Sequence, residues 1–157
     1  MPAIAQAPTR ARLIGRAEAA AALSFVAAAL HFYVVDEHMR EWWAYGAFFL
    51  AAGVGQAALA VLVMRRTPPW LLLTGIAGNL AIVAMYVLSR TNGPPLGPHA
   101  GRPEPAGLVD VACLLAELGT IGALLGLLPE RLARHTASLL ALTGIVLWTG
   151  RLTGVLL

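Results

Sequence analysis

Apolar residues in this chain fall into five long segments, separated by short polar or proline-rich breaks. The segments cover residues 17–35, 44–64, 70–89, 107–128 and 137–157. A helix needs about 20 mostly apolar residues to cross about 30 Å of hydrocarbon. The strand-length alternation of a membrane β-barrel is missing. The pattern therefore predicts an all-α integral membrane bundle of five transmembrane helices.

Composition supports a lipid environment. Hydrophobic residues make up 59% of the chain and charged residues 12%, whereas soluble domains are about 25% charged. Residues 1–16 precede the first apolar segment, and we expect residues 17–157 to form one transmembrane domain with an outer Pro/Gly loop at 90–106. The basic start followed by alanines could suggest a secretory signal. The apolar run continues to Val35, however, which is too long for one and favours an uncleaved helix.

The distribution of basic residues predicts the orientation, because cytoplasmic loops carry the excess of Lys and Arg. The 11 basic residues other than His are all Arg. One side of the predicted bundle has only Arg40, Arg90 and Arg102. The other side has Arg10, Arg12, Arg16, Arg65, Arg66, Arg131 and Arg134. We therefore expect a multi-pass protein of the inner (plasma) membrane, with a cytoplasmic N-terminus and an extracytoplasmic C-terminus.

Ionisable residues inside the apolar segments are the main candidates for function, since charges in hydrocarbon are costly and normally paired or functional. Glu117 falls near the middle of the fourth segment, and Asp110 lies on the same helix face two turns earlier. Arg151 in the fifth segment is the natural counter-ion for either acid. A structural ion pair and a proton or cation site both remain open.

Helical rise converts sequence position into approximate depth. On that basis His31, Asp110 and Arg151 share the outer third of the membrane. Asn79 and Gln56 reach the deeper level of Glu117. Two polar layers are therefore expected.

The histidines suggest a metal site. His31 and His38 share a helix face but lie about 10.5 Å apart along it, so one ion could join them only if the helix breaks near Asp36 or if His99 folds over from the loop. Imidazole and carboxylate would suit a divalent metal such as zinc, copper or iron. The alternative is an interfacial aromatic belt around Trp42 and Tyr45. Cys113 is the single cysteine and is interpreted as a small buried apolar residue, with no thiol metal cage.

Two motifs carry a resemblance to a known group of proteins. They are His31…Glu41-Trp42-Trp43-x-Tyr45-Gly46-x-Phe48-Phe49 and Arg90-Thr91-x-Gly93-x-Pro95-x-Gly97-Pro98. This combination resembles small polytopic integral membrane proteins of actinobacterial-type, GC-rich genomes. The resemblance spans the first four segments, implies a membrane fold and adds no catalytic residue.

Three functions are compatible with these residues. The first is binding of an ion or small polar ligand in an outward-facing cavity beneath the loop. His31 and Asp110, with His38 or His99, would line its entry near Arg151, and Glu117, Asn79 and Gln56 would form the inner layer of the ligand or proton site. The second is an accessory or structural subunit in a homo-oligomer or larger membrane complex. The third is a metal- or haem-dependent enzyme at the outer leaflet. Binding is favoured over catalysis because no nucleophile is paired with a base. No nucleic-acid partner is expected, because the basic residues are scattered over short loops.

Overall fold

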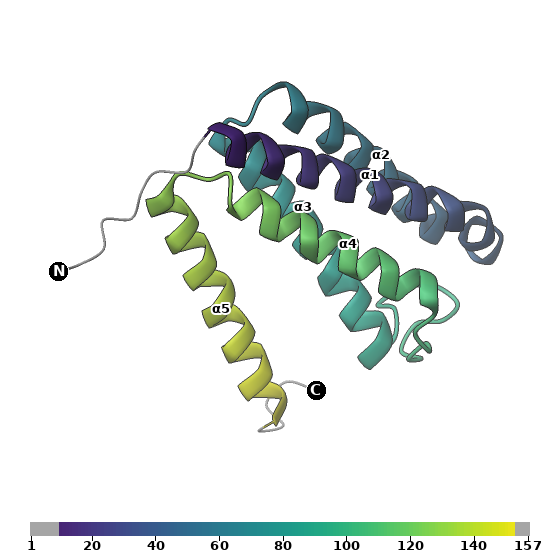
Figure 1. The fold of residues 1–157 in the computed structure, drawn as a ribbon. Helices are drawn as coiled ribbons and strands as arrows, with labels where there is room; N and C mark the ends of the chain where they lie inside the picture. Colours follow the sequence, from purple (N-terminus) through teal and green to yellow (C-terminus); the bar gives the residue numbers. More distant parts are fainter. Residues whose placement is uncertain (1–9, 153–157) are drawn as a thin grey trace.

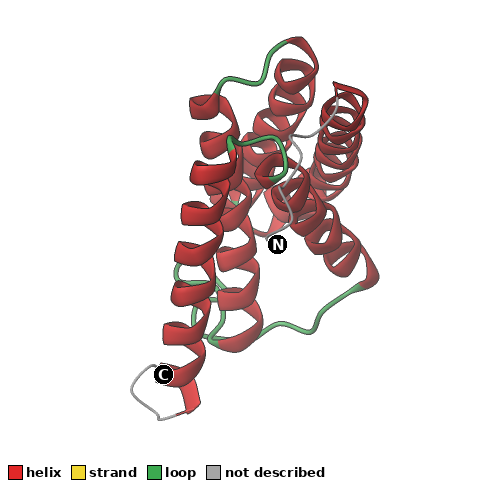
Figure 2. Cartoon of the chain, turned by 60° about the vertical axis from the view of Figure 1, so that its left-hand side comes forward, coloured by secondary structure: helices red, strands yellow, loops and turns green. Residues whose placement is uncertain are grey.

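The computed structural model describes residues 10–152, with only the backbone described at 151 and 152, and this range contains five helices and no strand. Their order along the chain is shown in Figure 1, and Figure 2 shows the loops that join them. The helices are α1 (Arg10–Glu41), α2 (Trp43–Arg65), α3 (Pro69–Thr91), α4 (Leu108–Leu125) and α5 (Glu130–Leu152).

Four of the helices, α1 to α4, are long and apolar enough to cross a membrane. This confirms the all-helical fold and the first four apolar segments. The helix α1 starts at Arg10 instead of residue 17 and continues through the polar residues 36–41, which were expected to be a break. The described part of α5 begins with the charged residues Glu130, Arg131 and Arg134. It is not among the helices whose length and hydropathy are sufficient to cross a membrane.

The bundle is held together by close approach of α1 to its neighbours. The helices α1 and α2 form a tight hairpin joined by the single residue Trp42, and α4 packs against both α1 and α3. A Cβ added to Gly53 of α2 would lie 2.8 Å from the ring of Phe32. One added to Gly119 of α4 would lie 2.9 Å from Leu23. These glycines let helices approach closely where lipid provides no hydrophobic force.

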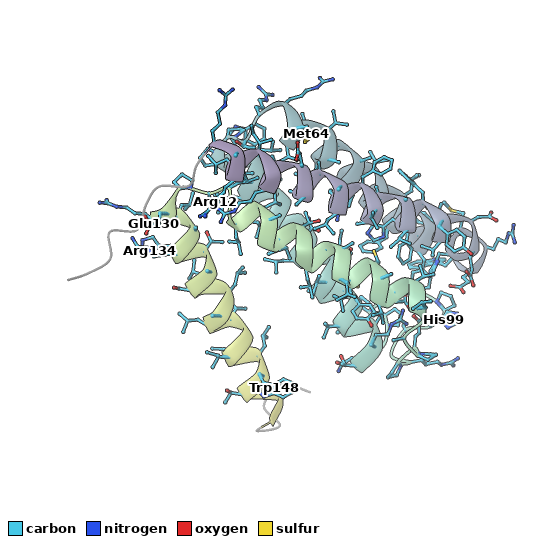
Figure 3. The ribbon with its side chains drawn as sticks, in the orientation of Figure 1. Arg12, Met64, His99, Glu130, Arg134 and Trp148 are labelled. Atoms are coloured by element: carbon cyan, nitrogen blue, oxygen red, sulfur yellow. The ribbon has the colours of Figure 1, made fainter. Side chains whose placement is uncertain are left out.

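The fifth helix stands apart from the others. It packs against the bundle mainly through α4 and then diverges from it (Figure 1). Its residues Leu139, Leu142 and Ile145 are exposed. Near its start, the exposed Glu130 and Arg134 approach each other at 4.0 Å (Figure 3).

A buried polar chain links three helices. The Ser24 hydroxyl on α1 donates to Gln56 Oε1 at 2.6 Å, and Gln56 Nε2 on α2 donates to Asn79 Oδ1 on α3 at 2.9 Å. Asn79 Nδ2 donates in turn to the Gly75 carbonyl at 2.8 Å. All the side-chain amides are therefore engaged, as burial in an apolar bundle requires. This network fixes how α1, α2 and α3 sit relative to one another.

Candidate metal and ligand site

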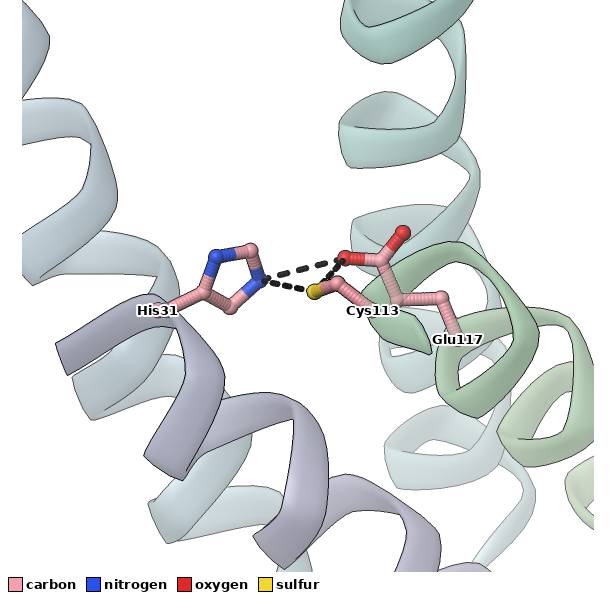
Figure 4. A group of neighbouring side chains, drawn as sticks. All are labelled: His31, Cys113 and Glu117. Atoms are coloured by element: carbon pink, nitrogen blue, oxygen red, sulfur yellow. Dashed lines mark hydrogen bonds and ion pairs between the residues drawn. The ribbon is translucent and has the colours of Figure 1, made fainter. Parts of the chain in front are cut away.

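Three potential metal ligands converge between α1 and α4. His31 extends from α1 toward Cys113 and Glu117 of α4 (Figure 4). Because Cys113 and Glu117 are four residues apart, they lie on the same face of α4. His31 and Glu117 are almost fully buried, with 3% and 2% of each residue exposed. The three groups thus meet inside the bundle, away from its lipid-facing surface.

The distances within this cluster are close to those between ligands of a tetrahedral ion. His31 Nε2 lies 3.1 Å from Glu117 Oε1 and 3.6 Å from Cys113 Sγ, and the sulfur lies 3.5 Å from the same carboxylate oxygen. Usual zinc bond lengths and tetrahedral angles put nitrogen and oxygen about 3.4 Å apart and sulfur about 3.6 Å from either. An ion could therefore enter with small movements of the side chains.

Hydrogen bonds hold the same three groups in the structure. The Cys113 thiol donates to Glu117 Oε1, and His31 Nε2 shares a hydrogen bond with the same oxygen. The imidazole ring also packs against Phe49, with ring centroids 5.9 Å apart. A metal ion would replace the thiol proton and bind the lone pair of Nε2 in the imidazole tautomer that carries its proton on Nδ1, since thiolate and neutral imidazole are the ligand forms. Nitrogen, sulfur and oxygen donors together suit zinc and related transition metals.

The cluster forms one end of a partly open cavity of about 300 Å³. Apolar and aromatic side chains from α1, α2, α3 and α4 make its walls. The other end is lined by the last turn of α3, the first turn of α4 and the loop between them. The wall residues include Leu30, Val34, Phe48, Phe49, Ile82, Met85, Tyr86 and Leu114. The cavity thus connects the buried ligands with the loop end of the bundle.

An arginine organises the loop end of the cavity. Arg90 donates to Glu104 Oε2 at 2.9 Å and forms an ion pair with Asp110 Oδ2 at 2.9 Å, and its guanidinium lies 5.4 Å from the centroid of the Tyr86 ring. Its Nε is buried and has no hydrogen-bond partner among the described residues. With Glu117 included, the charged lining has three carboxylates against one guanidinium. This excess of negative charge favours a cation in the cavity.

The loop is folded down onto aromatic side chains. The Tyr45 hydroxyl donates to the Leu96 carbonyl at 2.7 Å. Gly97 has φ +92°, and a Cβ there would lie 2.6 Å from the Trp42 ring, so both its conformation and the close contact require glycine. The backbone N–H of Glu104 donates to the Ser89 carbonyl at 3.2 Å. The segment therefore covers this end of the cavity in a defined conformation.

The structure brings some predicted site residues together and separates others. His31 and Glu117, which depth counting placed in different layers, are in direct contact. Asp110 lies at the loop end with Arg90, while Gln56 and Asn79 belong to the separate polar chain. The side chain of Arg151 lies outside the described residues, so its pairing with an acid stays a prediction. The depth estimates failed because they counted from assumed helix ends.

The other two candidate histidines do not join His31 at the cluster. The helix α1 is unbroken at Asp36, so His38 remains two turns away; its Nδ1 donates to the Val34 carbonyl at 2.9 Å, and its ring lines the cavity beside Phe49. His99 lies on the loop, where its ring centroid is 6.4 Å from that of Tyr45, and it does not line the cavity (Figure 3).

Cys113 was missed by the sequence reasoning. Its interpretation as an inert apolar residue needs correction, because its sulfur contacts both His31 and Glu117. The missed signal was the four-residue spacing of Cys113 and Glu117, which puts two potential ligands on one face of a helix.

Comparisons of the chain with protein-family models, with curated proteins and with solved structures gave no match. The functional conclusion therefore rests on the geometry of this cluster and its cavity.

Proposed function

We propose that this protein binds one transition-metal ion, with zinc as the best fit, through His31, Cys113 and Glu117 inside a membrane-embedded helix bundle. The observation that carries the proposal is the set of three donor separations, 3.1, 3.5 and 3.6 Å, which are close to the edges of a zinc tetrahedron. The donors are also of three types that zinc accepts. An ion fits this position without rebuilding the helices.

The cavity supports this proposal over a purely structural role. A buried pair of His31 and Glu117 could serve only to hold α1 against α4, as in the accessory-subunit hypothesis. That role needs no cavity beside the pair and no excess of carboxylates along it. A cation-binding site accounts for both features, since the negative charge attracts the ion and the cavity lets it reach its ligands.

Zinc titration of the purified protein tests the proposal. We expect one zinc ion per chain, with release of protons and with higher affinity at about pH 8 than at about pH 6, because zinc binds the thiolate and the neutral form of the imidazole. Isothermal titration calorimetry in buffers of different ionisation enthalpy measures both stoichiometry and proton release. Zinc binding that is weak, non-stoichiometric and independent of pH would leave the accessory-subunit function in its place.

We further propose that α5 forms a fifth span and that the N-terminus faces the cytoplasm of the cell whose inner (plasma) membrane holds the protein. Arg16 near the start of α1 donates to the Gly126 carbonyl after α4 at 2.5 Å, so these two points lie on one side of the bundle. Arg131 and Arg134 follow on that side. The positive-inside rule then makes it the cytoplasmic side.

Reporter fusions test this topology. Fusions at residues 67 and 133 should report the cytoplasm, and fusions at residue 98 and at the C-terminus should report the external side, because each span reverses the chain. An alkaline phosphatase and a fluorescent protein give opposite signals on the two sides. A cytoplasmic signal from the C-terminal fusion would show that α5 does not span, and an external signal at residue 67 would reverse the orientation.

A further inference from the structure

We propose that the cavity beside the metal site binds a small, uncharged aromatic molecule with an oxygen at each end, of the quinone or quinol class. This inference rests on the proposed metal function, because one oxygen of the molecule completes the coordination of the ion. The three described donors leave the fourth position of a tetrahedron open, as in sites where water or a substrate takes that position. Those same donors line the cavity, so a ligand there can reach the ion.

The walls of the cavity fit a flat ring. Phe48 and Phe49 of α2 and Met85 and Tyr86 of α3 line it together with Trp42. Aromatic side chains favour offset or edge contacts with another ring. The volume, about 300 Å³, is at the lower end of the range for small-molecule pockets. These dimensions suit a molecule of one or two rings.

The loop end supplies a donor for the second oxygen. Arg90 lines the cavity, and its guanidinium has five N–H groups, more than its pairing with Glu104 and Asp110 uses. Its partner Asp110 lies three residues before Cys113 and seven before Glu117 on α4, which corresponds to about 4.5 and 10.5 Å of helical rise. The two polar ends are therefore separated by roughly the length of a small ring system that carries oxygens on opposite sides.

Charge excludes the obvious alternative, an anionic ligand. Glu104 and Asp110 both pair with Arg90 and leave one negative charge in excess at the loop end, whereas at the other end the charges of a bound divalent ion, Glu117 and the Cys113 thiolate cancel. A carboxylate or phosphate would face net repulsion along this path. An uncharged molecule avoids that repulsion and still offers one oxygen to the ion and a second oxygen, as acceptor, to the Arg90 guanidinium. Its apolar ring can also partition into the membrane before it enters.

Duroquinol, a fully methylated quinol, is a suitable probe because its ring has no free position for addition of the Cys113 thiol. Durene is the matched control, since it has the same ring and methyl groups but no oxygens. The protein is loaded with Co²⁺ in lipid nanodiscs under argon, and each compound is titrated while the visible spectrum of the ion is recorded. We expect duroquinol to change the spectrum saturably and durene to leave it unchanged.

Two substitutions test the loop end. Arg90→Lys keeps a positive charge beside Glu104 and Asp110 but removes the guanidinium N–H groups that these carboxylates leave free, so it should weaken duroquinol binding about tenfold without changing Co²⁺ affinity. Arg102→Lys, on the exposed part of the loop, should change neither. Equal binding of duroquinol and durene, or no spectral change with duroquinol, would contradict a ligand of the quinone or quinol class. The proposed metal site would remain supported if zinc still bound in the titration. Failure of Co²⁺ and Zn²⁺ to bind would overturn the metal site and this inference together.

Discussion

Replacing Cys113 by Ser is expected to weaken zinc binding more than about hundredfold, because even loss of a second-shell contact costs 10–100-fold and this change removes a ligand. Serine keeps the size and a hydrogen bond to Glu117 but offers no thiolate. Competition with a chromophoric zinc chelator measures the affinity. His31→Gln and Glu117→Gln should each produce a loss of similar size, since each removes one of the three donors.

His38→Gln is the matched control for these variants. His38 lines the same cavity, but α1 holds it two turns from His31 and its Nδ1 donates to the Val34 carbonyl. Its replacement should leave zinc affinity unchanged within about a factor of two or three, because it contributes no bond to the ion. If His38→Gln lost as much affinity as Cys113→Ser, the ion would be bound elsewhere along the cavity.

Replacing Arg90 by Met should lower the free energy of unfolding by about 3 kcal/mol, because it leaves two partly buried carboxylates without their counter-ion. Glu104 and Asp110 both depend on this guanidinium, and only 19% of its side chain is exposed. Combining Arg90→Met with Glu104→Gln and Asp110→Asn should recover most of the loss, since no charge is then stranded. Unfolding by denaturing detergent in mixed micelles provides the comparison.

An exposed ion pair in the same protein provides the control for Arg90. Arg40 pairs with Asp36 at 2.5 Å, but about three quarters of each side chain is exposed, at 77% and 76%. Arg40→Met should therefore change the free energy of unfolding by less than about 1 kcal/mol. If Arg90→Met changed the free energy of unfolding as little as Arg40→Met, the carboxylates of Glu104 and Asp110 would be as well hydrated as those of a surface ion pair.

The helices could be predicted from the sequence because hydrocarbon thickness sets a length that apolar segments must meet. The second and third segments agree with α2 and α3 to within a residue or two. The extension of α1 through residues 36–41 was missed because polarity was taken as the end of the helix. Those residues project beyond the apolar segment, and Asp36 and Arg40 stabilise the helix by pairing across one turn.

The site could be predicted only in part. Helical periodicity shows which residues share a face of one helix, but it does not give the offset between two helices. Close contacts such as Phe32 with Gly53 and Leu23 with Gly119 determine that offset. This is why the contact of His31 with Glu117 was not foreseen. Arg90 was likewise not expected at the site, because its partners Glu104 and Asp110 lie on the far side of the loop in the sequence.

The visible spectrum of the Co²⁺-substituted protein tests the central claim most directly. Cobalt takes the ligands of zinc, and its absorption reports both the geometry of the site and the presence of a thiolate. With His31, Cys113 and Glu117 as ligands, we expect intense tetrahedral d–d bands and a thiolate-to-cobalt charge-transfer band that Cys113→Ser abolishes. A weak octahedral spectrum with no charge-transfer band, identical in wild type and Cys113→Ser, would contradict a metal site at this cluster.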